Sequence, residues 1–242
     1  MVRREGGKEA RERSRLARWI TSGALAITLL TGASTEVSAS AETGPIFPFT
    51  GAPQEPISGD GANCTFSGAG CHESFPVDSG PGSIAIEVPA SYEPGMTYAI
   101  TVDVTQEDQL RWGFQITVLD ALFQPAGEFA STDANTRVQT EFDLFTDRSY
   151  ITHSSPPANG TAAGTPGGNS WSFQWSAPAT DLGPVTFWAA GNAADNSVTS
   201  LGDYIYTTSV TIPAPEPGSF AAGLVALSTT AALARRCSRS PA

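Results

Sequence analysis

Two cysteines and a histidine form the one group in the sequence whose residue types and spacing suggest chemistry. Cys64 precedes Cys71 with six residues between them, and His72 follows directly. A Cys-x-x-Cys-His run attaches a c-type haem, because its sulfurs meet the two vinyl groups of one porphyrin and its histidine ligates the iron. The six-residue spacing between Cys64 and Cys71 removes that geometric reason for attaching a haem. A haem at Cys64, Cys71 and His72 is therefore the alternative, and we expect no cofactor and no bound metal.

A disulfide between Cys64 and Cys71 is the simpler interpretation of the pair. The thiols of an exported chain enter an oxidising compartment, and Gly68 and Gly70 allow the short loop between them to close. In the loop-entropy model such a bond stabilises the fold by about 2–3 kcal/mol. The third cysteine, Cys237, lies near the C-terminus, beyond a predicted cut or on the cytoplasmic side of the membrane, so the mature chain keeps an even pair.

Two further sets of polar residues could be functional or could be ordinary loop residues. His153 next to Ser154 could suggest a hydrolase, but the Ser-Ser-Pro-Pro context predicts a loop and no Gly-x-Ser-x-Gly elbow is present. Asp195, Asn196 and Asp203 could bind calcium, yet they lack the spacing of an EF-hand. A loop histidine and a solvated acidic loop are the default expectations.

The middle of the chain is strongly acidic. The sequence has 24 acidic and 13 basic residues, and only Arg111, Arg137 and Arg148 lie between residues 19 and 234. A surface of this charge repels nucleic acid and anionic lipid, so we expect no nucleic-acid partner. We expect Arg111 to form a structural ion pair. Asp203 either accepts from Arg111 or caps a turn.

The N-terminus has the layout of a secretory signal. Residues 1–18 are basic and polar, residues 19–31 are apolar, and Ala39-Ser40-Ala41 is a small-residue cleavage site, which together predict a signal peptide over 1–41. Residues 42–62 are rich in proline and glycine and have no periodicity. They predict a linker or an ordered N-terminal arm before the domain begins near residue 63.

The C-terminus predicts a minimal membrane anchor. Residues 220–234 are apolar, and a helix of this length spans about 22 Å, short of the roughly 30 Å hydrocarbon layer. Arg235 and Arg236 follow as positive-inside residues. The segment is preceded by Pro215-Glu216-Pro217, which cannot continue a strand ladder.

Apolar and polar residues alternate in a series of short segments between these ends. A period of two predicts strands with one buried face, and we expect them near 84–88, 98–104, 112–118, 137–145, 149–152, 171–175, 185–188 and 203–212. The segment Asn169–Trp188, with three of the five tryptophans, predicts an antiparallel hairpin at the core. Seven to eight strands without an amphipathic helix predict an immunoglobulin-like β-sandwich over 63–212, with an all-β barrel as its rival.

The order Pro215-Glu216-Pro217, apolar segment, Arg235-Arg236 resembles the PEP-CTERM sorting tail of Gram-negative bacteria, over residues 213–242. In that family the tail anchors the protein transiently in the inner membrane. An exosortase then cuts in or near the Pro-Glu-Pro motif, and the mature protein passes to the cell surface or extracellular matrix. The resemblance implies an exosortase as a transient partner.

A second resemblance covers most of residues 63–212. The chain is similar to the choice-of-anchor V domain, itself related to the reelin N-terminal (reeler) domain, in Gly80-Pro81-Gly82-Ser83-Ile84, Arg111-Trp112-Gly113-Phe114-Gln115, Asn169-Ser170-Trp171-Ser172-Phe173-Gln174-Trp175, Ala189-Ala190-Gly191-Asn192-Ala193 and Gly202-Asp203-Tyr204-Ile205-Tyr206. The resemblance implies a reeler-like β-sandwich and a surface location, with no catalytic activity. Many members carry Cys-x-x-Cys-His where this chain has the longer spacing.

These observations leave three functions. The first is an exported, non-catalytic protein of the cell surface or extracellular matrix, used for adhesion or for contact with exopolysaccharide or surface glycans, on which Trp188 could stack. The second is a redox protein with a c-type haem at Cys64, Cys71 and His72. The third is an exported hydrolase that uses His153.

Overall fold

The structure is a computed structural model that describes residues 44–45, 47–65, 71–140, 142, 146–154, 158–197 and 199–214. All of these residues belong to the unit Val37–Ala242. The predicted signal peptide (1–41) and the sorting motif from Pro215 to Arg236 lie outside the described residues. Within the described ranges the chain forms no helix with the length and apolar character that a membrane crossing needs.

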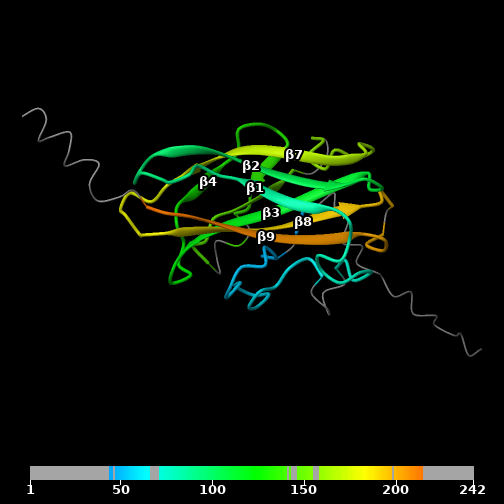
Figure 1. The fold of residues 1–242 in the computed structure, drawn as a ribbon, viewed down its shortest axis with the longest axis horizontal. Coiled ribbons are helices and arrows are strands. Elements are labelled where there is room, and N and C mark those ends of the chain that lie inside the picture. The colour runs from blue at the N-terminus through cyan, green and yellow to red at the C-terminus, as the bar shows by residue number, and fades with distance from the viewer. Residues whose placement is uncertain are drawn as a thin grey trace, which may run out of the picture. The chain divides into compact units, whose positions relative to one another are not determined.

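The described chain folds into two antiparallel sheets that pack face to face (Figure 1). The four-stranded sheet has the order β1 (Ser83–Glu87), β2 (Thr97–Gln106), β7 (Gly167–Ser176) and β4 (Glu128–Ala130). The five-stranded sheet has the order β5 (Thr136–Val138), β6 (Tyr150–His153), β3 (Arg111–Asp120), β8 (Val185–Ala194) and β9 (Tyr204–Ile212). The expected all-β fold is confirmed, and the chain forms a sandwich rather than a barrel.

The strand order is that of the immunoglobulin fold. In that fold strands A, B, E and D form one sheet and strands C, F and G form the other. Here β1, β2, β7 and β4 take the places of A, B, E and D, while β3, β8 and β9 take those of C, F and G. Two further strands, β6 and β5, extend the second sheet beyond β3. The short strand β4 was not expected, and β5 is shorter than the segment 137–145 predicted for it.

The predicted hairpin across Asn169–Trp188 is wrong. Strand β7 pairs with β2 over its whole length and with β4 at its end, whereas β8 pairs with β3 and β9. The turn-rich residues 177–184 carry the chain from one sheet to the other. The two strands therefore face each other across the core, where the rings of Trp175 and Phe187 lie edge to face with centroids 5.0 Å apart.

Apolar side chains at every second position of the strands fill the space between the sheets. Trp171, Phe173 and Trp175 of β7 are all buried, as their period of two predicts, while Ser172 and Gln174 between them are exposed. Aromatic pairs of this kind add to the free energy of burial through their edge-to-face geometry. In the other sheet, Gly191 of β8 leaves room for Val104, because a Cβ at Gly191 would lie 2.6 Å from a Val104 methyl group.

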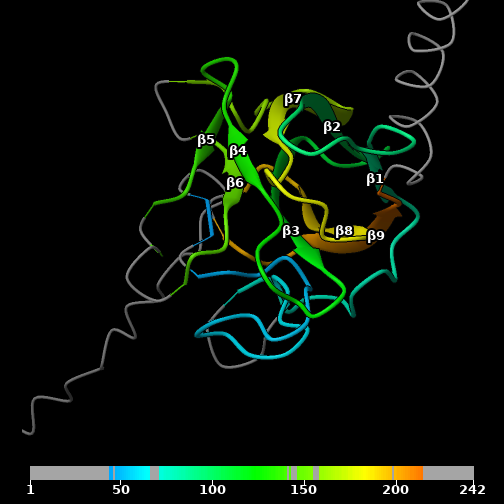
Figure 2. The same cartoon turned by 90° about the vertical axis from the view of Figure 1, so that its left-hand side faces the viewer.

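Residues 47–65 pack on the outer face of the five-stranded sheet, and we call them the N-terminal arm. Figures 1 and 2 show this segment, in blue, beside β9, β8 and β3. Phe49 and Ala52 of the arm are buried. Of the two alternatives for residues 42–62, the described part is therefore an ordered arm, and the packed unit begins well before residue 63.

The outer edge of β9 is partly covered by a loop from the chain's own N-terminal half. The Asp78 amide donates to the Ile205 carbonyl at 2.9 Å, and the Asp78 carboxylate accepts from the amide of Thr207 at 2.8 Å and from its hydroxyl at 2.9 Å. This side chain takes the place that a neighbouring strand would occupy in the ladder.

Candidate functional site

His72 lies in a buried polar cluster on the outer face of the five-stranded sheet. Its Nδ1 is 2.6 Å from Oδ2 of Asp203, the residue before β9. The side-chain amide of Asn192 on β8 lies 3.2 Å from His72 Nε2. Asp203 Oδ1 also accepts from the Asp195 amide at 3.3 Å. Asp203 therefore pairs with His72, and neither of the two roles that the sequence left open for it is the main one.

The two cysteines approach each other where the arm joins the sheet. The His72 amide donates to the Cys64 carbonyl at 3.0 Å, and both cysteines pack with Phe49 and Ala62 in one apolar cluster. Both thiols are free in the structure, so the Cys64–Cys71 disulfide stays a prediction. Burial, together with the neighbouring Cys71, raises the pKa of the Cys64 thiol to about 12. Burial and then Glu73 raise the pKa of Cys71.

The surroundings of His72 do not fit a haem iron. His72 is only 7% exposed, and both of its ring nitrogens lie within hydrogen-bond distance of Asp203 or Asn192. An axial ligand needs one ring nitrogen free to face the metal. Within the described residues no three His, Cys, Asp or Glu side chains are grouped as a metal site.

A buried polar strip runs along the outer face of the sheet beneath the arm. Gln115 and Thr117 of β3 and Thr152 of β6 are fully buried, although they point away from the core between the sheets. Gln115 forms two hydrogen bonds with the backbone of the arm. Its Oε1 accepts from the Phe49 amide at 2.6 Å, and its Nε2 donates to the Phe47 carbonyl at 3.4 Å. Gln115 is polar because its partners include backbone groups of the arm, whereas the Thr117 hydroxyl donates to the Ser149 carbonyl at 2.9 Å and the Thr152 hydroxyl donates to the Phe114 carbonyl.

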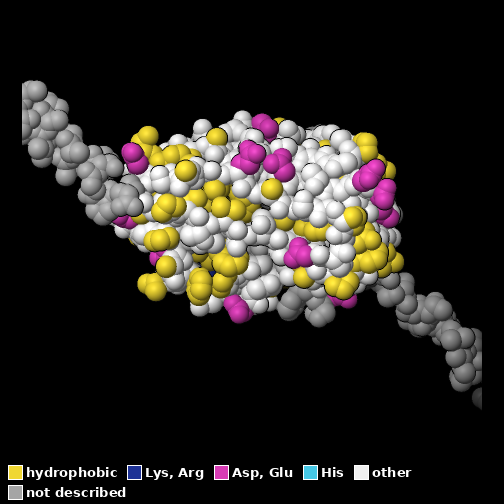
Figure 3. All heavy atoms as spheres, in the orientation of Figure 1, with side chains coloured by type: hydrophobic (Ala, Val, Ile, Leu, Met, Phe, Trp, Pro, Cys, Tyr) yellow, Lys and Arg dark blue, Asp and Glu magenta, His cyan; other side chains and the backbone are white. Residues whose placement is uncertain are grey.

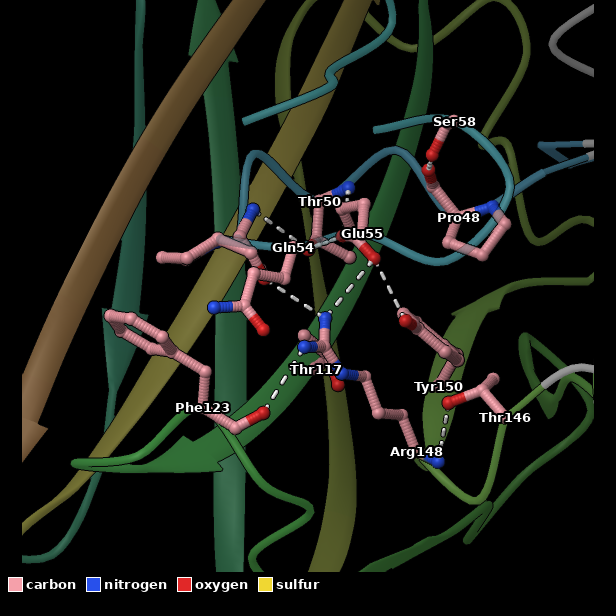
Figure 4. Close-up of polar contacts among 12 residues, drawn as sticks. Pro48, Thr50, Gln54, Glu55, Ser58, Thr117, Phe123, Thr146, Arg148 and Tyr150 are labelled. Carbon is pink, nitrogen blue, oxygen red and sulfur yellow. Dashed lines mark hydrogen bonds and ion pairs between the residues drawn. The ribbon is translucent and has the colours of Figure 1, made fainter. Parts of the chain in front are cut away.

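The strip ends in a buried ion pair that Figure 4 shows from close by. Glu55 of the arm accepts from the Tyr150 hydroxyl at 2.8 Å and from the Thr50 amide at 3.1 Å, and it lies 3.7 Å from the Arg148 guanidinium. Arg148 also donates to the Pro53 and Phe123 carbonyls, each at 3.1 Å. Burial raises the pKa of Glu55 above its ordinary value, against the lowering effect of these hydrogen bonds and of Arg148.

The candidates for hydrolysis and calcium binding are used within the fold. His153 is 3% exposed on β6, and its Nδ1 accepts from the Phe114 amide at 3.1 Å. The hydroxyl of Ser154 donates to the Ala134 carbonyl. Arg111 donates to the side chain of Asn196 at 2.8 Å. Asp203, a candidate for calcium binding, instead lies against His72.

Trp188 lies half-buried on the outer face of β8. Its indole nitrogen is buried and has no hydrogen-bond partner among the residues that the structure describes. The same holds for the side-chain oxygens of Asn192 and Gln109. Trp188 and Asn192 therefore leave unused polar groups on the face that the arm covers in part.

The exposed surface agrees with the acidic composition. The face drawn in Figure 3 shows acidic side chains among apolar and neutral ones, and no lysine or arginine is visible among its described residues. Of the three arginines in the middle of the chain, Arg148 is buried.

Glu55, Arg148, Gln115 and Tyr150 were not singled out by the sequence. The sequence did contain one indication of the ion pair. Glu55 lies in a proline-rich segment and Arg148 in an acidic domain, and a charged side chain needs a partner when it is buried.

No protein-family model and no curated protein matches the chain. Among solved structures, the chain is similar to an uncharacterized protein of Nocardia farcinica, described as having an immunoglobulin-like fold. The two are 13% identical with a TM-score of 0.33, and the match covers 54% of this chain and 98% of the other. Because a TM-score of 0.33 is low, we base the fold assignment on the strand order given above.

Proposed function

We propose that the chain is an exported bacterial protein of the cell surface or extracellular matrix, without catalytic activity, whose sandwich contacts exopolysaccharide or surface glycans. One observation carries the non-catalytic part. The sequence has two histidines, and both are buried and hydrogen-bonded within the fold. General acid–base catalysis near neutral pH depends most often on a histidine that reaches the substrate.

The delivery route that we propose follows from the two ends of the sequence. A signal peptide over 1–41 exports the chain, and the tail over 213–242 anchors it in the inner membrane until an exosortase cuts near Pro215-Glu216-Pro217. The acidic surface supports this proposal, because it suits a protein that stays soluble outside the cell and away from nucleic acid.

The intact mass of the protein recovered from the producing cells tests this route. We expect an N-terminus at Glu42, loss of the residues after the Pro-Glu-Pro motif, and a mass lower by two hydrogens from a disulfide. Full-length, reduced protein in the cytosol would contradict both export and sorting. A mass increase of one haem would favour the redox function instead.

Trp188 is the residue that we propose for contact with a sugar ring. An aromatic face stacks on the apolar side of a sugar, and the Trp188 side chain is only half-buried on the outer face of β8. We expect Trp188→Ala to lower binding to a glycan array or exopolysaccharide by at least about tenfold, which corresponds to about 1.4 kcal/mol. The matched control is Leu122→Ala, since Leu122 is 75% exposed in a loop between β3 and β4. Equal loss in both variants would refute the role of Trp188.

A further inference from the structure

The described chain ends at a fixed point of the sandwich. The Pro213 carbonyl, directly after β9, accepts from the Tyr92 amide at 3.3 Å, and Ala214 packs against the core. Tyr92 is fully buried, and its hydroxyl donates to the Gly183 carbonyl at 2.7 Å and accepts from the Leu182 amide at 3.2 Å. One buried tyrosine therefore ties the point where the chain leaves the domain to the loop between β7 and β8.

Three loops lie at the same end of the sandwich as this exit. The register places the start of β2 opposite the end of β7, and the start of β8 opposite the ends of both β3 and β9. The loops 88–96, 121–127 and 177–184 therefore lie at the end where residues 213–214 leave the domain, and Figure 1 shows them on the left, next to the end of β9 in orange. We call these loops together with residues 213–214 the exit end.

Each loop of the exit end exposes an apolar side chain. Met96 is 52% exposed, Leu122 is 75% exposed and Leu182 is 37% exposed. The opposite end of the sandwich also exposes two leucines, Leu110 before β3 and Leu201 before β9, at 36% and 68%. Single exposed apolar residues are common on protein surfaces, so these side chains alone assign a partner to neither end. The chain that leaves the exit end makes the difference.

The tether between the domain and the predicted membrane anchor is short. The apolar segment begins at Phe220, six positions after Ala214. Six residues span at most about 20 Å when fully extended. A strand of ten residues such as β8 is about 33 Å long, so a tether of this length cannot place the opposite end of the sandwich against the same membrane. While the anchor is in place, the exit end is therefore the end that faces the bilayer.

We propose that the exit end is a membrane-contact surface, on which Met96, Leu122 and Leu182 enter the headgroup region of a zwitterionic bilayer while the predicted tail anchors the chain. Apolar side chains gain free energy when they leave water at this boundary. Glu93 and Asp181 are exposed in the same loops, and their charge disfavours anionic headgroups. This inference rests on the anchor of the proposed function and adds an orientation, with the loops before β3 and β9 farthest from the membrane.

Fluorescent labels at the two ends of the sandwich test this orientation. The uncut chain without its signal peptide, carrying Cys237→Ser, receives a label at Leu122→Cys or, as the matched control, at Leu201→Cys. The same chain without an added cysteine gives the background from Cys64 and Cys71. Each protein is reconstituted into phosphatidylcholine vesicles that contain nitroxide-bearing lipids, which quench a label close to the bilayer. We expect at least fivefold stronger quenching at residue 122 than at residue 201.

A charge placed among the apolar side chains tests the contact itself. We expect Met96→Asp to lower the quenching at the residue 122 label at least twofold, and Leu182→Asp to act in the same direction. Leu110→Asp, at the opposite end, is the matched control and should leave the quenching unchanged. Vesicles with one quarter phosphatidylglycerol should also lower it.

The outcomes separate this inference from the anchor on which it rests. Flotation of the wild-type chain with the vesicles measures the anchor. Protein that floats but shows equal quenching at both labels, or stronger quenching at residue 201, would overturn the orientation. Quenching that both aspartate variants leave unchanged would overturn the contact through the apolar side chains. A wild-type chain that does not float would refute the anchor and this inference with it.

Discussion

His72 and Asp203 are 131 positions apart in the chain, and their side chains meet at 2.6 Å on the outer face of the five-stranded sheet. Both are buried, so each depends on the other to satisfy its polar group. The contact fastens the segment that follows the arm to the start of β9. A histidine next to two cysteines therefore has a structural partner.

Removing Asp203 should destabilise the fold. Asp203→Ala leaves His72 Nδ1 and the Asp195 amide without their acceptor, and we expect a loss of about 3 kcal/mol in the free energy of unfolding. Urea denaturation followed by tryptophan fluorescence measures it. The control is Glu107→Ala, because Glu107 is exposed in the loop after β2 and its loss should change stability by less than about 0.5 kcal/mol. Similar values for both variants would refute a role for the buried pair.

Gly191 should tolerate no side chain unless Val104 makes room. Gly191→Ala places a Cβ 2.6 Å from the Val104 methyl group, and we expect a loss of about 1–3 kcal/mol from overpacking. The double variant with Val104→Ala should be more stable than the sum of the two single changes by about 1 kcal/mol. Thermal and urea unfolding of the four proteins give this coupling. Strict additivity would show that the two residues do not compete for the space.

Stability should depend on pH through Glu55. Its pKa is raised in the folded protein above the ordinary 4.5, so the folded state holds the proton more tightly than the unfolded state. This contribution to stability is present below about pH 4.5 and is lost as the pH rises through the raised pKa of Glu55. Tyr150, Thr50 and Arg148 face the carboxyl and oppose the shift.

The difference between wild type and Glu55→Gln isolates this effect from the other acids. We expect wild type to lose stability relative to Glu55→Gln as the pH rises from 4.5 toward 7, because glutamine has no proton to release. Urea unfolding at a series of pH values measures it. A difference that moves in the opposite direction would mean that Arg148 outweighs the burial of the carboxylate.

The thiol of Cys64 should be slow to react in reduced, folded protein. A pKa of about 12 against an ordinary 9.0 lowers the thiolate fraction at pH 8 by about three orders of magnitude. In a Cys71→Ser background, reaction with a disulfide reagent should be at least about 100-fold slower in buffer than in urea. Equal rates in the two solvents would show that the sulfur is not desolvated. Protein from the producing cells should give no reaction in urea if the predicted disulfide has formed.

The sequence predicts the core better than it predicts which strands are neighbours. The alternation of Trp171, Phe173 and Trp175 predicts one buried face, and the structure confirms it. The same pattern carries no information about the sheet in which a strand lies, so β7 and β8 were expected to pair although they belong to opposite sheets. Alternation describes the environment of a side chain, whereas pairing depends on the path of the loop between strands.

The polar contacts of the outer face were beyond prediction for a different reason. His72 meets Asp203 and Glu55 meets Arg148 only after distant segments have packed, and no local spacing records either pair. The arm has no periodicity because it belongs to none of the nine strands, and side chains of the sheet and its loops hold its backbone.

Asp78 lowers the tendency of the protein to aggregate through the edge of β9 at high concentration. An open β-strand rim is a template on which further chains add, and this is how cross-β fibres begin. The Asp78 carboxylate places an acidic side chain at that rim and accepts from both the amide and the hydroxyl of Thr207. A concentrated solution of such molecules can thus stay free of amyloid-like growth.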